Sequence, residues 1–560
     1  YGLNKENTSR DSYIPSDVYY ALQRKSRGNL GYGKRQQSTL EGTLTFQHKF
    51  GELLDMNLMA GMGRYLDSGD GSDISYENAN DHIQGSSVGM ADGPFYPTSY
   101  KYKNEKRSQF VRGNFDLLGR YVVSASLRRD GTDKFFPSKK YALFPSVSLA
   151  WKMNEESFIK NISWINMLKL RASYGETGSD NLGTTLYGIV TTTREDVQFN
   201  NNSVTYIPYI LSGANYEDVT WQKTVMKNIG LDFSVLRDRI WGSVDVFRND
   251  VTHLLGTAPT ELLGMHGTRP INGGHYKRTG VDVSLNSLNL QTHDFKWTSQ
   301  ITLSHYNAVW IERMPNYDYQ KYQKRKNEPM NAFYYYKTTG IINVDKSNMP
   351  ESQRSLGPAA CMPGYPIVED KNGDGIIDVN DSYMDNTLPK LYFGFGNTFT
   401  WKNFDLDIFM YGQLGVKKWN DAYGNSIDVG GLSRGVDAHN VGIYSYNIWN
   451  TQTNTNGRFP GIAISKSVAL PENLGFDYTR ENASYIRVRN ITLGYNLGPK
   501  ELSVFKGYIR GIRVFVDFQN PLTFTKYKGY DPEINTSSSN LTGGQYPQMR
   551  VYSIGAKLTF

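Results

Sequence analysis

Apolar and polar residues alternate one by one through much of this chain, in stretches of about ten residues. In one such stretch, Phe404, Leu406 and Ile408 alternate with Asp405 and Asp407. Because successive side chains of a β-strand point to opposite faces, the pattern predicts strands with one apolar and one polar face.

The C-terminal segment, residues 549–560, repeats this pattern and ends on an aromatic residue, Phe560. Tyr552, Ile554 and Leu558 fall on one face of the expected strand, and Lys557 falls on the other. Such a strand suits a wall between hydrocarbon and water. A soluble protein can end in the same way, so this segment alone does not distinguish a membrane barrel from a soluble fold.

About fifteen segments of roughly membrane-spanning length carry the same signal. They are residues 39–48, 54–63, 109–118, 121–130, 143–152, 167–176, 224–234, 240–250, 278–288, 295–306, 392–401, 404–413, 485–496, 511–519 and 549–560.

Short connections alternate with mostly long ones between these segments. Gly119-Arg120 and Lys402-Asn403 are short connections. The long ones are residues 64–108, 177–223, 251–277, 307–391, 414–484 and 520–548. This sorting is typical of an up-and-down antiparallel barrel with short periplasmic turns and long extracellular loops, and a β-sandwich would not produce it. We therefore expect an all-β transmembrane barrel over residues 39–560.

The first 38 residues are expected to be the end of a preceding extracellular loop or strand, because Tyr19-Tyr20 and a Gly-, Arg- and Lys-rich stretch replace the alternation. An odd strand count is unusual for a bacterial barrel formed by one chain. Earlier strands, including the closing partner of the last strand, are therefore expected outside this chain.

Composition agrees with a membrane barrel. Apolar residues make up only 39% of the 560 residues, yet aromatic residues reach 13%, with 40 Tyr. Alternating strands flanked by aromatic girdles have this composition. The net charge of +7 is spread along the chain without a dense basic run, which argues against nucleic-acid binding. A single cysteine, Cys361, excludes a disulfide framework within the chain.

Four consecutive motifs are similar to those of a known family. They read LRRDGTDKF at 127–135, FPSVSLAW at 144–151, NEESFI at 154–159 and LKLRASYGETG at 168–178. In this order and spacing, the chain resembles the C-terminal barrel portion of SusC/RagA-type TonB-dependent outer-membrane transporters of Bacteroidetes.

The resemblance implies a barrel of about 22 strands, filled by an N-terminal plug that this chain does not contain. It also implies TonB-energised import of oligosaccharides or peptides across the outer membrane of a Gram-negative, Bacteroidetes-like bacterium. The implied partners are a SusD-like lipoprotein lid, the TonB complex acting through the N-terminal part, and outer-membrane lipid. A dimer of transporter–lipoprotein pairs is compatible with it, and an enzyme is not expected.

One loop has the spacing of a calcium-binding segment, in which hard oxygen ligands surround one ion and a glycine permits the sharp turn. Gly375 is that glycine, and Asp381 replaces the usual bidentate Glu. The candidate ligands are Asp370, Asn372, Asp374, the carbonyl of Ile376, Asp378 and Asp381. We expect a structural Ca²⁺ ion, with Mg²⁺ as an alternative; the competing interpretation is a solvated turn without an ion.

Aromatic residues gather in two of the long loops, where flat rings and hydroxyl groups suit sugars or peptides. The candidate substrate-binding residues are Trp310, Tyr317, Tyr319, Tyr322, Tyr334, Tyr335, Tyr336, Tyr444, Tyr446 and Trp449. Packing of the loops against one another, or contact with a partner protein, is the alternative role for each of them.

Two alternative functions stay open at this point. A secreted β-rich glycan-binding adhesin or glycosidase would also expose aromatic residues, and a passive porin would share the barrel. The G-x-S-x-G sequence at residues 85–89 lacks the strand and helix that a catalytic serine needs. His253, His266 and His275 lack paired metal-ligand spacing. The loop sorting and the terminal Phe560 favour the barrel.

Overall fold

The protein is described by a computed structural model. The described residues are 1–15, 26–79, 88–182, 191–194, 199–201, 204–206, 209–212, 217–259, 268–315, 319–324, 327–420, 443–461, 470–499, 501–505, 508–529, 531–534 and 547–560.

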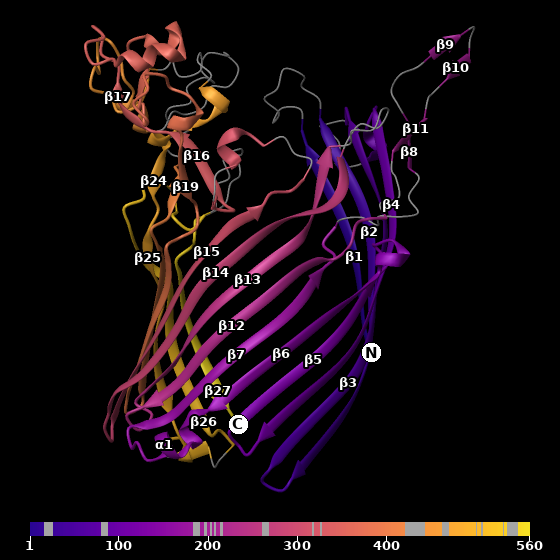
Figure 1. Ribbon diagram of the computed structural model, residues 1–560, viewed down its shortest axis with the longest axis vertical. Coiled ribbons are helices and arrows are strands. Elements are labelled where there is room, and N and C mark those ends of the chain that lie inside the picture. The colour runs from indigo at the N-terminus through magenta and orange to yellow at the C-terminus, as the bar shows by residue number, and fades with distance from the viewer. Residues whose placement is uncertain are drawn as a thin grey trace.

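One antiparallel sheet of 16 strands dominates the fold, and the strands follow one another in chain order. Figure 1 shows them tilted and wound around a common interior. The strands are β1 (Gly2–Ile14), β2 (Arg27–Phe50), β3 (Leu54–Glu77), β4 (Phe95–Leu117), β5 (Tyr121–Thr132), β6 (Tyr141–Lys152), β7 (Ile165–Ser179), β12 (Gln222–Val235), β13 (Ile240–Pro259), β14 (Thr268–Gln291), β15 (Phe295–Glu312), β20 (Leu391–Trp401), β21 (Phe404–Leu414), β25 (Tyr485–Leu497), β26 (Gly511–Thr525) and β27 (Val551–Thr559).

Every strand expected from the alternation is confirmed, and residues 1–38, expected to be the end of a preceding loop or strand, contain strand β1 and the first part of β2. Residues Gly2 to Ile14 pair along their whole length with residues Arg27 to Thr39 of β2. The alternation does not reveal this hairpin. Lys34 and Gln36 lie on the outer face of β2, which touches lipid further down the strand, yet both are polar, and so are most residues of β1. Strands that rise above a membrane have no reason to keep an apolar face.

Several strands extend further than expected for the same reason. β3 continues to Glu77 and β4 begins at Phe95, so both strands extend into the expected loop 64–108. Likewise, β13 continues to Pro259 and β14 begins at Thr268, so both strands extend into the expected loop 251–277.

The sheet has an apolar outer face and a polar inner face. In β6, the apolar side chains Leu143, Val147 and Leu149 are all exposed, and Tyr141 and Trp151 flank them on the same face. Exposed apolar residues between two aromatic residues match a lipid-facing band about 25 Å tall.

Aromatic pairs line the rim where the short turns lie. Tyr121 stacks on Trp151 with ring centroids 6.5 Å apart, Trp297 stacks on Phe399 at 5.6 Å, and Trp401 stacks on Phe404 at 6.1 Å. These rings form the interfacial girdle that composition predicted.

Two long connections fold together into a unit that we call the cap (residues 327–390, 443–461 and 470–484). Figure 1 shows its first strands gathered above one side of the sheet. β16 (Ala332–Tyr336) pairs with β19 (Tyr383–Asn386) from its own loop and with β23 (Gly475–Phe476) from the other. Its cores include Tyr336 with Val368, Ile377 and Leu470, and Ile342 with Ala360, Tyr365 and Ile367.

The remaining elements are short. They are β8 (Thr191–Arg194), β9 (Phe199–Asn201), β10 (Val204–Tyr206), β11 (Tyr209–Ser212), β17 (Thr338–Ile341), β18 (Pro366–Val368), β22 (Lys417–Trp419), β24 (Arg480–Asn482) and α1 (Ser157–Lys160). Of the helices in the described ranges, none has the length and apolar character needed to cross a membrane.

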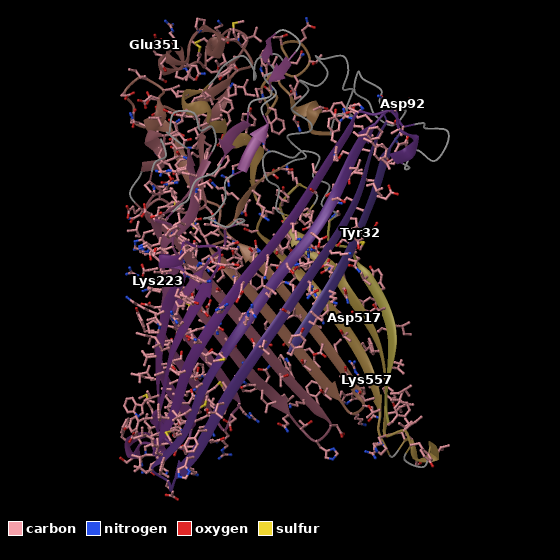
Figure 2. All side chains as sticks on the ribbon, turned by 90° about the vertical axis from the view of Figure 1, so that its right-hand side faces the viewer. Tyr32, Asp92, Lys223, Glu351, Asp517 and Lys557 are labelled. Carbon is pink, nitrogen blue, oxygen red and sulfur yellow. The ribbon has the colours of Figure 1, made fainter. Side chains whose placement is uncertain are left out.

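The sheet has two edges. Within the described residues, β1 pairs only with β2, and β27 pairs only with β26. Figure 2 shows Asp517 and Lys557 on strands of the C-terminal edge, below the level of Tyr32 on β2.

Candidate functional site

The inner face of the sheet carries charged groups that pair with one another. Arg171 of β7 donates through Nε and Nη2 to Asp232 of β12, at 2.9 and 2.7 Å, and through Nη2 to Asp245 of β13, at 3.1 Å. Gly230 lies between these side chains; a Cβ atom there would stand 2.7 Å from Arg171 Nη2. The glycine therefore makes room for an ion pair that spans three strands.

Hydroxyl groups surround this ion pair. A hollow of about 760 Å³ on the inner wall is lined by Arg171, Asp245 and Asn228. Its serines are Ser124, Ser126, Ser146, Ser148 and Ser173. Ser126 and Ser146 lie 2.7 Å apart between their Oγ atoms. Arg112, Arg278 and Asp282 line the same hollow. A wall of hydroxyl, amide and charged groups suits water and polar solutes.

The C-terminal part of the wall follows the same rule. Arg513 of β26 donates to Asp405 of β21, at 2.6 Å between Nη2 and Oδ2. Thr398 donates to Asp407 at 2.5 Å, and Thr492 donates to Asp517 at 2.6 Å. Asp407 and Asp517 thus have partners on the neighbouring strand, and the partner of Asp405 lies two strands away.

A segment after β26, here called the strap (residues 526–529 and 531–534), is fixed to the inner wall. Arg487 of β25 donates to Asp531 at 2.8 Å and to Glu533 at 2.5 Å. The side chains of Arg487 and Asp531 are only 3% and 4% exposed. Tyr411 donates to Glu533 Oε2 at 2.8 Å, and Lys418 donates to the carbonyl of Pro532 at 2.5 Å.

The contacts of the strap also lower the pKa of Asp531. Burial opposes the charge on Asp531, but the N–H groups of Glu533 and Gln548 and the guanidinium of Arg487 outweigh it. Together they hold the pKa of Asp531 below its usual range. Asp531 is therefore an ionised anchor at neutral pH.

Three of the candidate aromatic residues pack inside the cap. Tyr335, Tyr336 and Trp449 are buried, and the Tyr336 hydroxyl donates to the carbonyl of Asp378 at 3.0 Å. Trp449 packs against Gly364, where a Cβ atom would touch its ring. These three residues take the packing role that the sequence left open, and burial leaves them no surface for a substrate.

Other candidate aromatic residues stay accessible. The guanidinium of Arg313 lies between the rings of Trp310 and Tyr319, at 5.0 and 5.1 Å from their centroids. Tyr322 and Tyr334 contact each other with centroids 4.6 Å apart. Tyr446 is 84% exposed. Tyr317 and the side chain of Tyr444 lie outside the described part of the chain.

The acidic loop at residues 370–381 is closed by its own hydrogen bonds. Asp370 accepts from the N–H groups of Gly373 and Gly375, at 2.8 and 2.9 Å. The buried Asp381 accepts from Lys371 N at 2.9 Å and from Asp378 N at 2.8 Å. Asp374 accepts from Ile376 N, and the Asn372 side-chain oxygen accepts from Asp374 N.

Both loop glycines, Gly373 and Gly375, have positive φ angles of 74° and 86°, as the expected sharp turn requires. Where the chain is described, no three His, Cys, Asp or Glu side chains converge in a way that could hold a metal ion. In this arrangement, the carboxylates stabilise the turn through backbone donors.

Sequence reasoning missed the strap. Arg487 and Asp531 are 44 residues apart, and no motif connects them. The sequence did contain a signal. Arg487 is a basic residue near the loop end of its strand, and two acidic residues, Asp531 and Glu533, follow in the next long loop. The G-x-S-x-G serine at position 87 lies outside the described residues.

A sheet with a lipid-facing apolar band, an aromatic girdle and a polar interior defines an outer-membrane β-barrel. Residues 1–520 match the sequence model of a family described as TonB dependent receptor-like, beta-barrel. The chain belongs to this family, whose members are outer-membrane transporters rather than enzymes.

Relatives and solved structures agree. The chain is 26% identical over 600 residues to TonB-dependent receptor P3 of Formosa agariphila, covering 100% of this chain and 56% of the relative. It is 28% identical over 484 residues to TonB-dependent receptor SusC of Bacteroides thetaiotaomicron, covering 83% of this chain and 44% of the relative. A solved structure described as the RagAB peptide transporter superposes with a TM-score of 0.79 at 20% identity, covering 100% of this chain and 59% of that one.

The SusC/RagA-type resemblance is thus confirmed, and so is the location in the outer membrane. The chain spans about half the length of the curated relatives that it matches.

Proposed function

We propose that this chain forms the wall of a TonB-energised importer that takes up oligosaccharides or peptides. The observation that carries the proposal is the inner wall, where the ion pairs around Arg171 and Arg513 neutralise each other among hydroxyl groups. Paired charges among hydroxyl groups let a large polar solute pass without binding it tightly. The names of the relatives, both TonB-dependent receptors, support the energy source.

We further propose that a SusD-like surface lipoprotein covers the mouth, and that TonB acts through a part of the transporter other than this wall. The cap supports the first partner. It is a folded unit with its own cores, and it offers exposed side chains such as Val344, Met362 and Tyr446 to a protein above it. We also propose that two such transporter–lipoprotein pairs form a dimer.

The test is uptake by intact cells. Deletion of the gene should abolish uptake of labelled oligosaccharides or peptides, and the gene supplied on a plasmid should restore it. Removal of TonB or collapse of the proton gradient should abolish uptake as well. Uptake that survives loss of TonB would indicate a passive porin. Release of the protein from membranes by high salt without detergent would indicate a secreted adhesin or glycosidase.

We also propose that residues 370–381 bind a structural Ca²⁺ ion, with Mg²⁺ as the alternative. Asp370, Asn372, Asp374, the Ile376 carbonyl, Asp378 and Asp381 are the proposed ligands. The turn geometry at Gly373 and Gly375 supports it, because the backbone already bends as a calcium loop requires. The ion would stiffen this exposed loop, which Tyr336 already joins to the core of the cap through the carbonyl of Asp378.

A further inference from the structure

Two tyrosines of β4 lie on the inner face of the sheet, in the part of the strand above the lipid-facing band. Tyr100 and Tyr102 are separated from Arg112, which lines the inner hollow, by even numbers of residues. The ladder between β3 and β4 runs without a register shift over this distance. Because side chains alternate between faces, both tyrosines share the face of Arg112.

Glycines of the neighbouring strands let both rings lie flat on the sheet. A Cβ atom at Gly71 of β3 would stand 2.7 Å from Tyr100 Cζ, and one at Gly33 of β2 would stand 3.0 Å from the Tyr100 hydroxyl. A Cβ atom at Gly69 would stand 2.7 Å from Tyr102 Cε1. Each ring therefore leans across β3 on a floor without side chains.

The two rings form a continuous surface, which we call the tyrosine platform (Tyr100 and Tyr102). Their centroids are 6.4 Å apart and their planes differ by 19°. Tyr100 is 50% exposed although its underside rests on glycine. The exposed area is therefore on the side that faces away from the sheet.

The outer face at the same level is polar, which places the platform above the lipid. Lys34 of β2 and Lys101 and Lys103 of β4 are exposed on that face. Figure 2 shows Tyr32, on the outer face of β2 beside the platform's floor, high on the long strands. A solute that enters the mouth from outside would meet the platform before the inner hollow.

Polar side chains border the platform, and their charges are neutralised. Arg35 donates to Asp67 through Nε and Nη2, at 3.0 and 2.6 Å. Gln37 also donates to Asp67, at 3.5 Å, and the Tyr102 hydroxyl donates to it at 3.4 Å. Beside Tyr102, the border thus offers planar amide, guanidinium and carboxylate groups, and the charges of Arg35 and Asp67 pair with each other.

We propose that the tyrosine platform binds a neutral saccharide chain at the mouth of the barrel. Pyranose rings present a flat C–H face that stacks on aromatic rings, and their hydroxyl groups pair with planar polar side chains at the edge. Two rings in near-parallel planes accept consecutive sugar units. A peptide chain lacks such a repeated flat C–H face, so it would gain less from two near-parallel rings. The proposal rests on the proposed import function and narrows its substrate to saccharides.

The test is binding to the purified full-length transporter in detergent, measured by isothermal titration calorimetry. The probes are maltohexaose, cellohexaose, xylohexaose and laminarihexaose, with an uncharged Gly/Ser/Thr hexapeptide for comparison. We expect at least one hexasaccharide to bind. The double substitution Tyr100→Leu and Tyr102→Leu should weaken that binding at least about tenfold, since stacking on each ring contributes on the order of threefold to tenfold.

Two further variants isolate the platform. Tyr32→Leu removes an exposed tyrosine of the same height from the outer face, where Tyr32 is 48% exposed, and should leave affinity unchanged. Tyr100→Phe with Tyr102→Phe keeps both ring faces and should retain binding within about threefold. If the leucine variant does not assemble, the phenylalanine variant and the probe set still decide.

Three results would overturn the proposal: no hexasaccharide binds, the hexapeptide alone binds, or the leucine variant binds saccharide as tightly as the unaltered protein. Binding in detergent does not need TonB or a proton gradient. Intact platform binding with failed uptake would therefore refute the import function and leave the platform in place.

Discussion

At the scale of single residues, Gln353 shows how the cap holds its shape. Its side chain is fully buried and makes three hydrogen bonds to backbone groups. Nε2 donates to the carbonyls of Ala360 and Pro366, at 3.0 and 3.1 Å, and Oε1 accepts from Val368 N at 3.0 Å. One amide group thus joins a turn of 3₁₀-helix to strand β18.

Replacing Gln353 with Met should destabilise the cap by about 2–3 kcal/mol, because the new side chain fills the space but leaves buried backbone groups without partners. Hydrogen exchange at the Val368 amide should become faster. Glu351→Gln, a substitution at a neighbouring exposed residue, is the control and should change nothing. Unchanged protection of Val368 in the Gln353 variant would contradict the assignment.

The cation loop gives a second prediction at this scale. Asp370→Asn should weaken calcium binding at least about tenfold, because it removes a charged ligand from a site that needs several hard oxygens. Calorimetric titration with Ca²⁺ and with Mg²⁺ measures it. Asp345→Asn is the matched control, since Asp345 also closes a tight turn, by accepting from Ser347, but lies outside the loop. Absence of Ca²⁺ binding by the unaltered protein would show that hydrogen bonds alone close the loop.

Residue identity alone did not separate contact residues from packing residues. The spacing of the acidic loop predicted its turn, because both glycines and the acidic side chains act within one short segment. Tyr336, in contrast, is buried against Leu470 from another loop. Its role depends on how two distant connections fold together, and local sequence carries no record of that contact.

At the scale of elements, the strap joins the last extracellular loop to the wall through a buried ion pair. Such a pair contributes little net stability, but losing one partner leaves an unpaired buried charge. Because the pKa of Asp531 is lowered in the folded state, its contribution to stability is complete above the unfolded value of about 3.9. The contribution is lost as pH falls from there through the lowered value.

The strap should therefore detach in acid and stay attached from about pH 5 upward. A nitroxide label at Lys528→Cys, in a Cys361→Ser background, should become more mobile in its resonance spectrum below about pH 4. The substitution Asp531→Asn should raise mobility at neutral pH and remove this acid transition. Equal mobility of the label at pH 7 and at pH 2.5 in the unaltered strap would refute the role of Asp531.

The elements themselves were predictable where lipid imposes a pattern. Each strand segment that crosses the apolar band has one apolar face, so the alternation found it. Above the band, β1 and the upper parts of β2, β3 and β4 have water on their outer face. Because both faces of these segments meet water, their sequences do not alternate between apolar and polar residues. Only their pairing in the sheet shows that they are strands.

At the scale of the whole molecule, one sheet separates lipid from a polar interior. Its outer face touches lipid through residues such as Leu149 and Ile229, and its inner face presents hydroxyl groups and paired charges. The cap lies above one side of the sheet, and the strap is fixed to the inner wall. Two consecutive residues of a strand therefore face opposite environments, one towards lipid and the other towards water.

Neighbouring residues of β12 test this arrangement directly. Ile229 is 62% exposed on the outer face, and Asn228 lines the inner hollow. Ile229→Arg should destabilise the folded barrel by about 2–4 kcal/mol, because it places a charge near the middle of the lipid band. Asn228→Arg, one position along the same strand, should cost less than about 1 kcal/mol, because the interior is polar and hydrated.

The measurement is folding of the full-length transporter into lipid vesicles across a urea series, followed by the mobility shift of unheated samples on gels. The midpoint should move to lower urea for Ile229→Arg and stay near the unaltered value for Asn228→Arg. Ile229→Asn, with an intermediate shift, distinguishes loss of apolar surface from burial of charge. Equal shifts for the two arginine variants, or a larger shift for Asn228→Arg, would mean that the faces are assigned the wrong way round. In that case, the lipid belt, the inner hollow and the tyrosine platform would all have to be reassigned together, because a one-residue change in register exchanges every side chain between the two faces.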